Sequence, residues 1–313
     1  MVKGGIMADL SIDYCGVSFP NPLVLPSGIA QEIPRDHDRF AKSGVGSITT
    51  KSLTIEPREG NPLPRVLKTE NVFLNSVGLR GPGLEKGVPL VADFIKTSPV
   101  PVLVSVFATK VADFERFAEA FLPVMGNALF ELNLSCPNVE DDMGKALGIG
   151  ADSSAAAVKA VKKILGKIPV LAKLTPNVPN IAEVAKACEA AGADGLVAIN
   201  TVGPGMVIDI VRRKPVLGAK RGGVSGPGIK TVTIRCIYDI YEAVKIPIIG
   251  MGGITTVQDT IEAMMAGSKL VGVGTATYFK GIGVFEEIKK GLSEYMEKNG
   301  ITNLKEIVGA AHA

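Results

Sequence analysis

The stretch VLAKLTPNVPNIAEVAKACEAAGADGLVAIN, residues 170–200, decides the fold. It begins with an apolar, β-rich run at Val170–Leu174 and continues with a helical pattern at Ile181–Ala191. A second β-rich run follows at Gly195–Asn200. Short strands that alternate with amphipathic helices are typical of parallel strands joined by crossover helices. The stretch therefore predicts one β–α–β unit.

The same alternation extends over most of the chain, with helical patterns such as Ala155–Leu165 and Thr256–Ala266. Eight strands and eight helices in about 250 residues predict an α/β fold, the (β/α)8 TIM barrel. We expect residues 1–313 to form a single domain. The predicted strands are Leu23–Leu25, Val45–Thr50, Val100–Val106, Leu129–Leu134, Val170–Leu174, Gly195–Asn200, Ile246–Gly250 and Leu270–Gly274.

A doubly wound sheet is the alternative fold. Its G-x-G-x-x-G fingerprint is missing after the first strand, and the Gly-rich turns lie late in the chain instead. Before the first strand, Ser11–Pro20 is typical of a hairpin that closes the bottom of the barrel. Long loops at the carboxyl ends of the strands complete the predicted architecture.

Composition excludes several classes of protein. The net charge of +3 gives no reason to expect a nucleic-acid partner. The four cysteines are dispersed without a C-x-x-C pair, so no disulfide framework, metal site or iron–sulfur site is indicated. Met1–Met7 lacks the apolar segment of a secretory signal, and no apolar run approaches the roughly 20 residues of a membrane span. We expect a cytoplasmic enzyme without membrane contact.

Polar and Gly-rich residues follow seven of the predicted strands. In a TIM barrel the active site is built at the carboxyl ends of the strands. Turn chemistry alone explains any one of these groups, but their convergence predicts a site there. The groups are Pro26-Ser27-Gly28, Thr50-Lys51-Ser52, Asn133 to Asn138, Lys173, Asn200-Thr201, Gly250 to Gly253 and Gly274-Thr275.

Two of these groups have a specific chemical meaning. Gly252-Gly253 and Gly274-Thr275 each precede a helical pattern, so their backbone N–H groups are placed to bind one phosphate. Tight turns without a ligand are the alternative. Lys51 and Lys173 end apolar strands, where an unpaired charge is costly, so we expect each to meet an anionic or electron-rich partner. Extension of the lysines to solvent is the alternative.

The segment Asn133-Leu134-Ser135-Cys136-Pro137-Asn138 brings a thiol to the end of a buried strand. The amides of Asn133 and Asn138 flank it, which suits a small, planar, polar substrate. A buried structural cysteine is the alternative. Only two histidines occur, neither in a central position, so a Ser-His-Asp or Cys-His pair is not indicated. Cys136 remains a candidate proton acceptor.

Three connections are long enough to be functional, Leu53–Gly83, Ser135–Asp152 and Thr201–Gly228. The second contains Cys136 together with Gly144, Gly148 and Gly150. We interpret it as a lid that closes over the substrate. The third is basic, and solvated surface is the alternative interpretation of its charges.

From about Leu10 to Ile288 the chain resembles the class 1 dihydroorotate dehydrogenases. This resemblance implies an FMN-containing barrel that oxidises (S)-dihydroorotate to orotate in pyrimidine (UMP) biosynthesis. It rests on Asn21-Pro22 with Ser27-Gly28, Lys51 with Arg58-Glu59-Gly60-Asn61-Pro62, Asn75-Ser76-Val77-Gly78-Leu79, Asn133 to Asn138, Lys173-Leu174-Thr175-Pro176-Asn177, Asn200-Thr201, Ser225-Gly226-Pro227 and Gly250-Met251-Gly252-Gly253.

The resemblance also implies roles for individual residues. Cys136 is similar to the base that removes the C5 proton, while the hydride leaves C6 for the flavin N5. The implied substrate contacts are Lys51, Asn75, Ser76, Val77, Gly78, Leu79, Asn133, Asn138, Asn200 and Thr201. The implied FMN contacts are Ser27, Lys51, Ser52, Asn133, Lys173, Ile199, Gly226, Gly252, Gly253, Gly274 and Thr275.

One position departs from the family pattern. Relatives commonly have Asn at the end of the third strand, where this chain has Ser105. The shorter hydroxyl puts a direct flavin contact there in doubt.

The stretches Asn200–Met206 and Arg213–Gly226 resemble class 1B most closely. That class implies a heterotetramer of two catalytic and two partner subunits. The partner subunit carries FAD and a 2Fe–2S cluster and passes electrons to NAD. A class 1A homodimer that reduces fumarate is the alternative. A tRNA dihydrouridine synthase and a non-catalytic binding barrel are two further alternatives from other functional classes.

Overall fold

The computed structural model describes residues 8–31, 33, 35–134 and 150–313. Eight parallel strands close a barrel in the order β10-β15-β16-β3-β4-β7-β8-β9, which confirms the TIM-barrel prediction. Each strand overlaps one of the predicted runs. The strands are β3 (Leu23–Leu25), β4 (Ser47–Thr49), β7 (Val102–Val106), β8 (Leu129–Asn133), β9 (Val170–Lys173), β10 (Gly195–Ala198), β15 (Ile248–Met251) and β16 (Ser268–Gly272).

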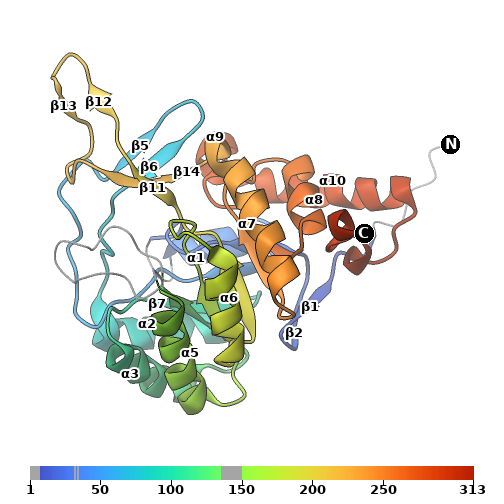
Figure 1. The fold of residues 1–313 in the computed structure, drawn as a ribbon, viewed down its shortest axis with the longest axis horizontal. Coiled ribbons are helices and arrows are strands. Elements are labelled where there is room, and N and C mark those ends of the chain that lie inside the picture. Colours follow the sequence, from blue (N-terminus) through green and yellow to red (C-terminus); the bar gives the residue numbers. More distant parts are fainter. Residues whose placement is uncertain (1–7, 32, 34, 135–149) are drawn as a thin grey trace.

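Helices surround the barrel (Figure 1). Because they cover its outer face, the strands are buried on both faces and their sequences are almost continuously apolar. In α3, for example, Phe114, Phe117 and Phe121 recur at helical spacing and are fully buried. The helices are α1 (Arg35–Ala41), α2 (Gly83–Thr97), α3 (Val111–Phe121), α5 (Ala151–Leu165), α6 (Ile181–Ala190), α7 (Lys230–Ala243), α8 (Val257–Met265), α9 (Ala276–Lys280) and α10 (Val284–Asn299).

The predicted N-terminal hairpin consists of β1 (Ile12–Tyr14) and β2 (Val17–Phe19). Its Tyr14 hydroxyl is fully buried and lies 3.3 Å and 3.1 Å from the carbonyl oxygens of Leu196 and Pro247. These two carbonyls belong to the beginnings of β10 and β15. The hairpin therefore packs against the amino-terminal end of the barrel, as predicted, and leaves the opposite end to the site.

Two segments that the sequence predicts as loops, Leu53–Gly83 and Thr201–Gly228, instead contribute strands to a second sheet. The strands are antiparallel and lie in the order β11-β14-β6-β5. They are only three or four residues long, and β11 reads Val-Gly-Pro-Gly, so their alternation is too weak to detect. The strands are β5 (Val66–Lys68), β6 (Phe73–Asn75), β11 (Val202–Gly205) and β14 (Gly222–Ser225).

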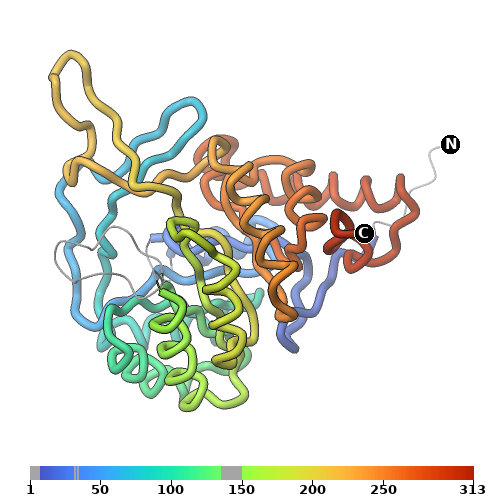
Figure 2. The backbone as a smooth tube through the Cα atoms, viewed as in Figure 1, coloured from blue at the N-terminus to red at the C-terminus, as the bar shows by residue number. Residues whose placement is uncertain are grey.

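A two-stranded hairpin extends beyond this sheet. It consists of β12 (Ile208–Asp209) and β13 (Lys214–Pro215) and projects away from the barrel (Figures 1 and 2). At its tip Ile210 and Val211 are 85% and 87% exposed. In Figure 2 the β5–β6 and β12–β13 segments project on the same side of the molecule. Among the described helices, none combines the length and apolar character needed to cross a membrane.

Candidate functional site

A cavity of about 430 Å³ lies at the carboxyl ends of the barrel strands, beneath the second sheet. This volume is within the range of ligand pockets, roughly 300–1,000 Å³. Most of the residues predicted to bind substrate or cofactor line it together. They are Ser27, Lys51, Ser52, Asn75, Val77, Gly78, Leu79, Asn133, Lys173, Ile199, Asn200, Thr201, Gly252, Gly253, Gly274 and Thr275.

Other predicted residues do not line this cavity. Ser76 is buried and its hydroxyl accepts a hydrogen bond of 2.8 Å from Asn61 Nδ2. Gly226 begins the short 3-10 turn Pro227–Ile229, and its neighbour Ser225 lines the cavity in its place. Cys136 and Asn138 lie outside the described residues, as does the predicted lid up to residue 149.

Several cavity-lining residues carry no strong sequence signal. Phe73 and Tyr278 stack with ring centroids 4.8 Å apart, which brings β6 against α9. The two rings come from segments that are distant in sequence, so only tertiary pairing reveals them. Arg65 and Arg80 flank the Asn75–Leu79 motif, and proximity to that motif is the signal that could have found them. Further lining residues of this kind are Gly28, Ile29, Gln31, Ile229, Met251 and Ile254.

A chain of uncharged hydrogen bonds forms the floor of the cavity. Asn133 Nδ2 donates to Ser52 Oγ at 3.0 Å, and Ser52 Oγ lies 3.1 Å from Ser27 Oγ. On its inner side Ser52 Oγ lies 2.8 Å from Ser105 Oγ. Ser105 is fully buried and is not among the residues that line the cavity.

The chain continues towards the second sheet. Asn200 Nδ2 donates to Asn133 Oδ1 at 3.4 Å, and the Thr201 N–H donates to Asn200 Oδ1 at 2.8 Å. Thr201 can occupy this position only because Gly223 lies opposite, since a Cβ atom on that glycine would lie 2.2 Å from Thr201 Oγ1. The result is a row of fixed amide and hydroxyl groups that suits a planar polar ligand.

Two lysines bring positive charge to this row. Lys51 and Lys173 are only 8% and 5% exposed, so their ammonium groups do not extend into solvent. Lys173 lies opposite Asn133 in the pairing of β8 with β9. Both lysines line the cavity, so they place two cations where a ligand would bind.

The Gly-rich turns after β15 and β16 offer backbone donors. In the described part of the chain, no hydrogen bond uses the N–H of Gly253, Gly274 or Thr275. Gly253 has φ +74°, and a Cβ atom there would lie 2.7 Å from the backbone nitrogen of Lys230. Glycine is therefore required for the β15 turn to pack against the start of α7.

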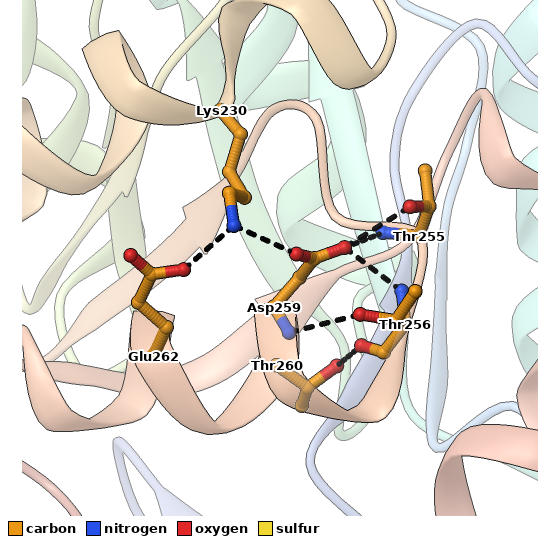
Figure 3. Close-up of polar contacts among 6 residues, drawn as sticks. All are labelled: Lys230, Thr255, Thr256, Asp259, Thr260 and Glu262. Atoms are coloured by element: carbon orange, nitrogen blue, oxygen red, sulfur yellow. Dashed lines mark hydrogen bonds and ion pairs between the residues drawn. The ribbon is translucent and has the colours of Figure 1, made fainter.

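A charged network holds this turn from outside (Figure 3). Asp259 Oδ2 accepts hydrogen bonds from the Thr255 N–H, the Thr255 hydroxyl and the Thr256 N–H, at 2.9, 3.0 and 3.0 Å. In return, Thr256 Oγ1 accepts from the Asp259 N–H at 3.1 Å, so the two residues form a capping box at the start of α8.

Lys230 joins the network from α7. Its Nζ lies 3.0 Å from Asp259 Oδ1 and 2.8 Å from Glu262 Oε2. Burial raises the pKa of Asp259, but the hydrogen bonds from Lys230 and the two threonines outweigh burial and lower the pKa below its ordinary 3.8. The hydrogen bonds to Glu262 and Asp259 raise the pKa of Lys230. Both groups are therefore charged at neutral pH. Their ion pair joins the first turns of α7 and α8 beside the Gly-rich turn.

Comparison with known proteins identifies the family. The family model of dihydroorotate dehydrogenase matches residues 9–296. A Pyrococcus furiosus protein named "Dihydroorotate dehydrogenase B (NAD(+)), catalytic subunit" is 44% identical, and the match covers 96% of this chain and 98% of the relative. Proteins of the same name from Pyrococcus abyssi and Methanocaldococcus jannaschii are 41% and 40% identical, and the matches cover 96% and 97% of this chain and 99% and 98% of the relatives.

Proposed function

The chain belongs to the dihydroorotate dehydrogenase family, and from this premise we propose that it uses FMN to oxidise (S)-dihydroorotate to orotate in pyrimidine biosynthesis. The observation that carries the proposal is the cavity. It combines a row of uncharged amide and hydroxyl groups with two buried lysines and two Gly-rich turns. A flavin and a small planar substrate need these three features in one place. We further propose that residues 1–313 form a single FMN-binding domain.

FMN fits the groups that are present. The N–H groups of Gly253, Gly274 and Thr275, which make no hydrogen bond to any described residue, suit a phosphate. Gly28 lines the cavity, and a Cβ atom there would meet nothing within 4 Å, so space for a ligand is open beside it. Lys173 lies on the neighbouring strand to Asn133 and supplies positive charge for an electron-rich ring.

The residues of the chain divide the chemistry between them. When bound, FMN supplies the acceptor for the hydride that leaves C6 of the substrate. Cys136 removes the proton from C5 as general base. Asn75, Asn133 and Asn200 hold the substrate ring by hydrogen bonds. Lys51 stabilises the negative charge that develops during the reaction, because a fixed cation in a buried site interacts strongly with it.

Anaerobic mixing of the purified flavin-loaded chain with dihydroorotate tests this function. We expect the flavin absorbance to bleach and orotate to form in equal amount. A flavin that stays oxidised at saturating dihydroorotate would contradict the proposal.

For the electron acceptor we propose the class 1B arrangement. Two of these chains associate with two partner subunits that carry FAD and a 2Fe–2S cluster, and the electrons pass to NAD. The support is that three relatives with 40–44% identity carry the name "Dihydroorotate dehydrogenase B (NAD(+)), catalytic subunit". The exposed apolar tip of the β12–β13 hairpin is typical of a surface that a partner covers.

The isolated chain should reduce an artificial dye but not NAD, and added partner should confer NAD reduction. Rapid turnover with fumarate alone would favour the class 1A alternative.

A further inference from the structure

The fully buried Ser105 lies behind the cavity floor, and its hydroxyl is linked to the cavity-lining residues described here through Ser52 Oγ. We propose that Ser105 is a positioning residue that fixes the Ser52 hydroxyl and, through it, the carboxamide of Asn133. The inference rests on the proposed function, because it assigns Asn133 to the substrate and flavin.

The hydrogen-bonding capacity of the Ser52 hydroxyl is limited. A serine hydroxyl has one proton and two acceptor positions. Asn133 Nδ2 can only donate, at 3.0 Å, so it occupies one acceptor position of Ser52 Oγ. The two remaining neighbours are Ser27 Oγ at 3.1 Å and Ser105 Oγ at 2.8 Å. One of them must donate to Ser52 and the other must accept from it. Ser52 is therefore saturated only when Ser105 carries a hydroxyl.

Backbone hydrogen bonds fix the positions of Ser27 and Ser105 on the two sides of Ser52. The Ser52 N–H donates to Ser27 Oγ at 3.1 Å, so Ser27 is held on one side of Ser52 by two contacts. Ser105 is held on the other side by its strand, where its N–H donates to Thr50 Oγ1 at 3.0 Å. The shortest of the hydroxyl contacts is therefore made by a residue whose main chain is fixed within the barrel.

The hydrogen bonds among Ser27, Ser52 and Ser105 determine how the Asn133 carboxamide is oriented. Its Nδ2 faces Ser52, and its Oδ1 faces Asn200 Nδ2 at 3.4 Å. Without the Ser105 hydroxyl, Ser52 Oγ keeps Ser27 and Asn133 as neighbours but loses its contact on the barrel side, so the direction in which it accepts from Asn133 Nδ2 is less well fixed. In a buried network a missing partner costs more than it would in water. The expected loss is in substrate positioning, while FMN stays bound through contacts elsewhere in the cavity.

The test is a double-mutant cycle read by orotate binding. FMN-loaded wild type, Ser105→Ala, Ser52→Ala and the double variant are titrated with orotate while the flavin absorption band is followed. We expect Ser105→Ala to raise the orotate dissociation constant about tenfold, equivalent to about 1.4 kcal/mol. We expect the double variant to bind no more weakly than Ser52→Ala, because Ser105 acts only through Ser52.

Ser268→Ala is the matched control. Ser268 is a fully buried serine on barrel strand β16, and its hydroxyl has no partner among the described residues. It should match wild type in orotate affinity and should be no less stable than wild type, because it removes no hydrogen bond. Additive effects of Ser52→Ala and Ser105→Ala, or equal affinity of Ser105→Ala and Ser268→Ala, would overturn the proposal. Failure of the wild type itself to bind orotate would instead count against the proposed function.

Discussion

The two ends of the cavity are held by opposite kinds of interaction. The Gly-rich turn after β15 is held from outside by a charged network of Lys230, Asp259 and Glu262, whose lysine is 31% exposed. The floor near Asn133 is held from inside by uncharged hydroxyls and amides, and Ser105 is fully buried. Charged groups near water keep part of their solvation, whereas unpaired charges in a barrel core would be costly.

Because the two ends are held by different interactions, mutations at each end should have different effects. The charged network fixes the position of a loop. Its loss should therefore disturb the proposed phosphate site, which consists of the N–H groups of Gly253, Gly274 and Thr275. The uncharged row fixes the direction of individual hydrogen bonds, so its loss should affect the substrate. FMN retention and substrate chemistry therefore report on different ends of the cavity.

The largest expected effect is at Cys136. If its thiol is the base, Cys136→Ala should slow flavin reduction by about 10²–10⁴, the usual worth of a general base. FMN should stay bound, because the proton acceptor is separate from the proposed FMN contacts. Cys136→Ser should recover activity only weakly at high pH, since a hydroxyl is far less acidic. Near-normal anaerobic reduction by Cys136→Ala would contradict the assignment.

The other cysteines provide an internal control by alkylation. Burial raises the pKa of the Cys15 thiol and of the Cys188 thiol to about 12, and also raises the pKa of Cys236. All three thiols are therefore protonated and unreactive at neutral pH. Iodoacetamide should inactivate the enzyme by labelling Cys136 alone, and orotate should protect it. Mass spectrometry of the labelled peptides checks this, and inactivation with label confined to another cysteine would refute it.

A smaller effect is expected at Asp259. Asp259→Asn removes the charge that binds Lys230 and weakens the acceptor for Thr255 and Thr256. We expect the free energy of unfolding to fall by about 1–3 kcal/mol and the FMN dissociation constant to rise about tenfold. Asp239→Asn is the matched control, because Asp239 forms an exposed ion pair with Arg235 on α7. Equal FMN affinity in the two variants would show that the charged network does not support the proposed phosphate site.

The pH dependence of the same group has a defined sign. The pKa of Asp259 in the folded protein lies below its ordinary value of 3.8, so the unfolded chain binds this proton more tightly. The stabilisation is therefore fully present above pH 3.8 and is lost as the pH falls through the lower folded value. We expect the acid unfolding of Asp259→Asn to be less steep than that of wild type below pH 3.8.

The sequence predicts those parts of the molecule that have a local signal. Each barrel strand is a short apolar run, and polar residues mark its carboxyl end, so most of the predicted contacts line one cavity. The second sheet has no comparable signal, because Phe73 pairs with Ser225, 152 positions further along the chain. Tertiary pairing, rather than the periodicity of either segment, creates those strands.

The two supporting networks differ in the same way. The Thr256-x-x-Asp259 pattern is a readable capping signal, but its link to Lys230 depends on how α7 packs beside α8. Ser105 appears in the sequence only as a departure from the family pattern. Its contact with Ser52 arises because β4 and β7 are neighbours in the barrel.

The smallest effect is expected at Glu262. This carboxylate is 48% exposed and pairs with Lys230, whereas Asp259 pairs with Lys230 and also accepts hydrogen bonds from the loop itself. A partly exposed ion pair is worth about 0–1 kcal/mol. Glu262→Gln should therefore raise the FMN dissociation constant by less than about threefold, and its melting temperature should stay near that of wild type. Measured beside Asp259→Asn, it distinguishes the charge on Lys230 from the carboxylate–threonine bonds as the support of the turn. If Glu262→Gln releases FMN as readily as Asp259→Asn, the turn depends on Lys230, and the capping box is not what holds it.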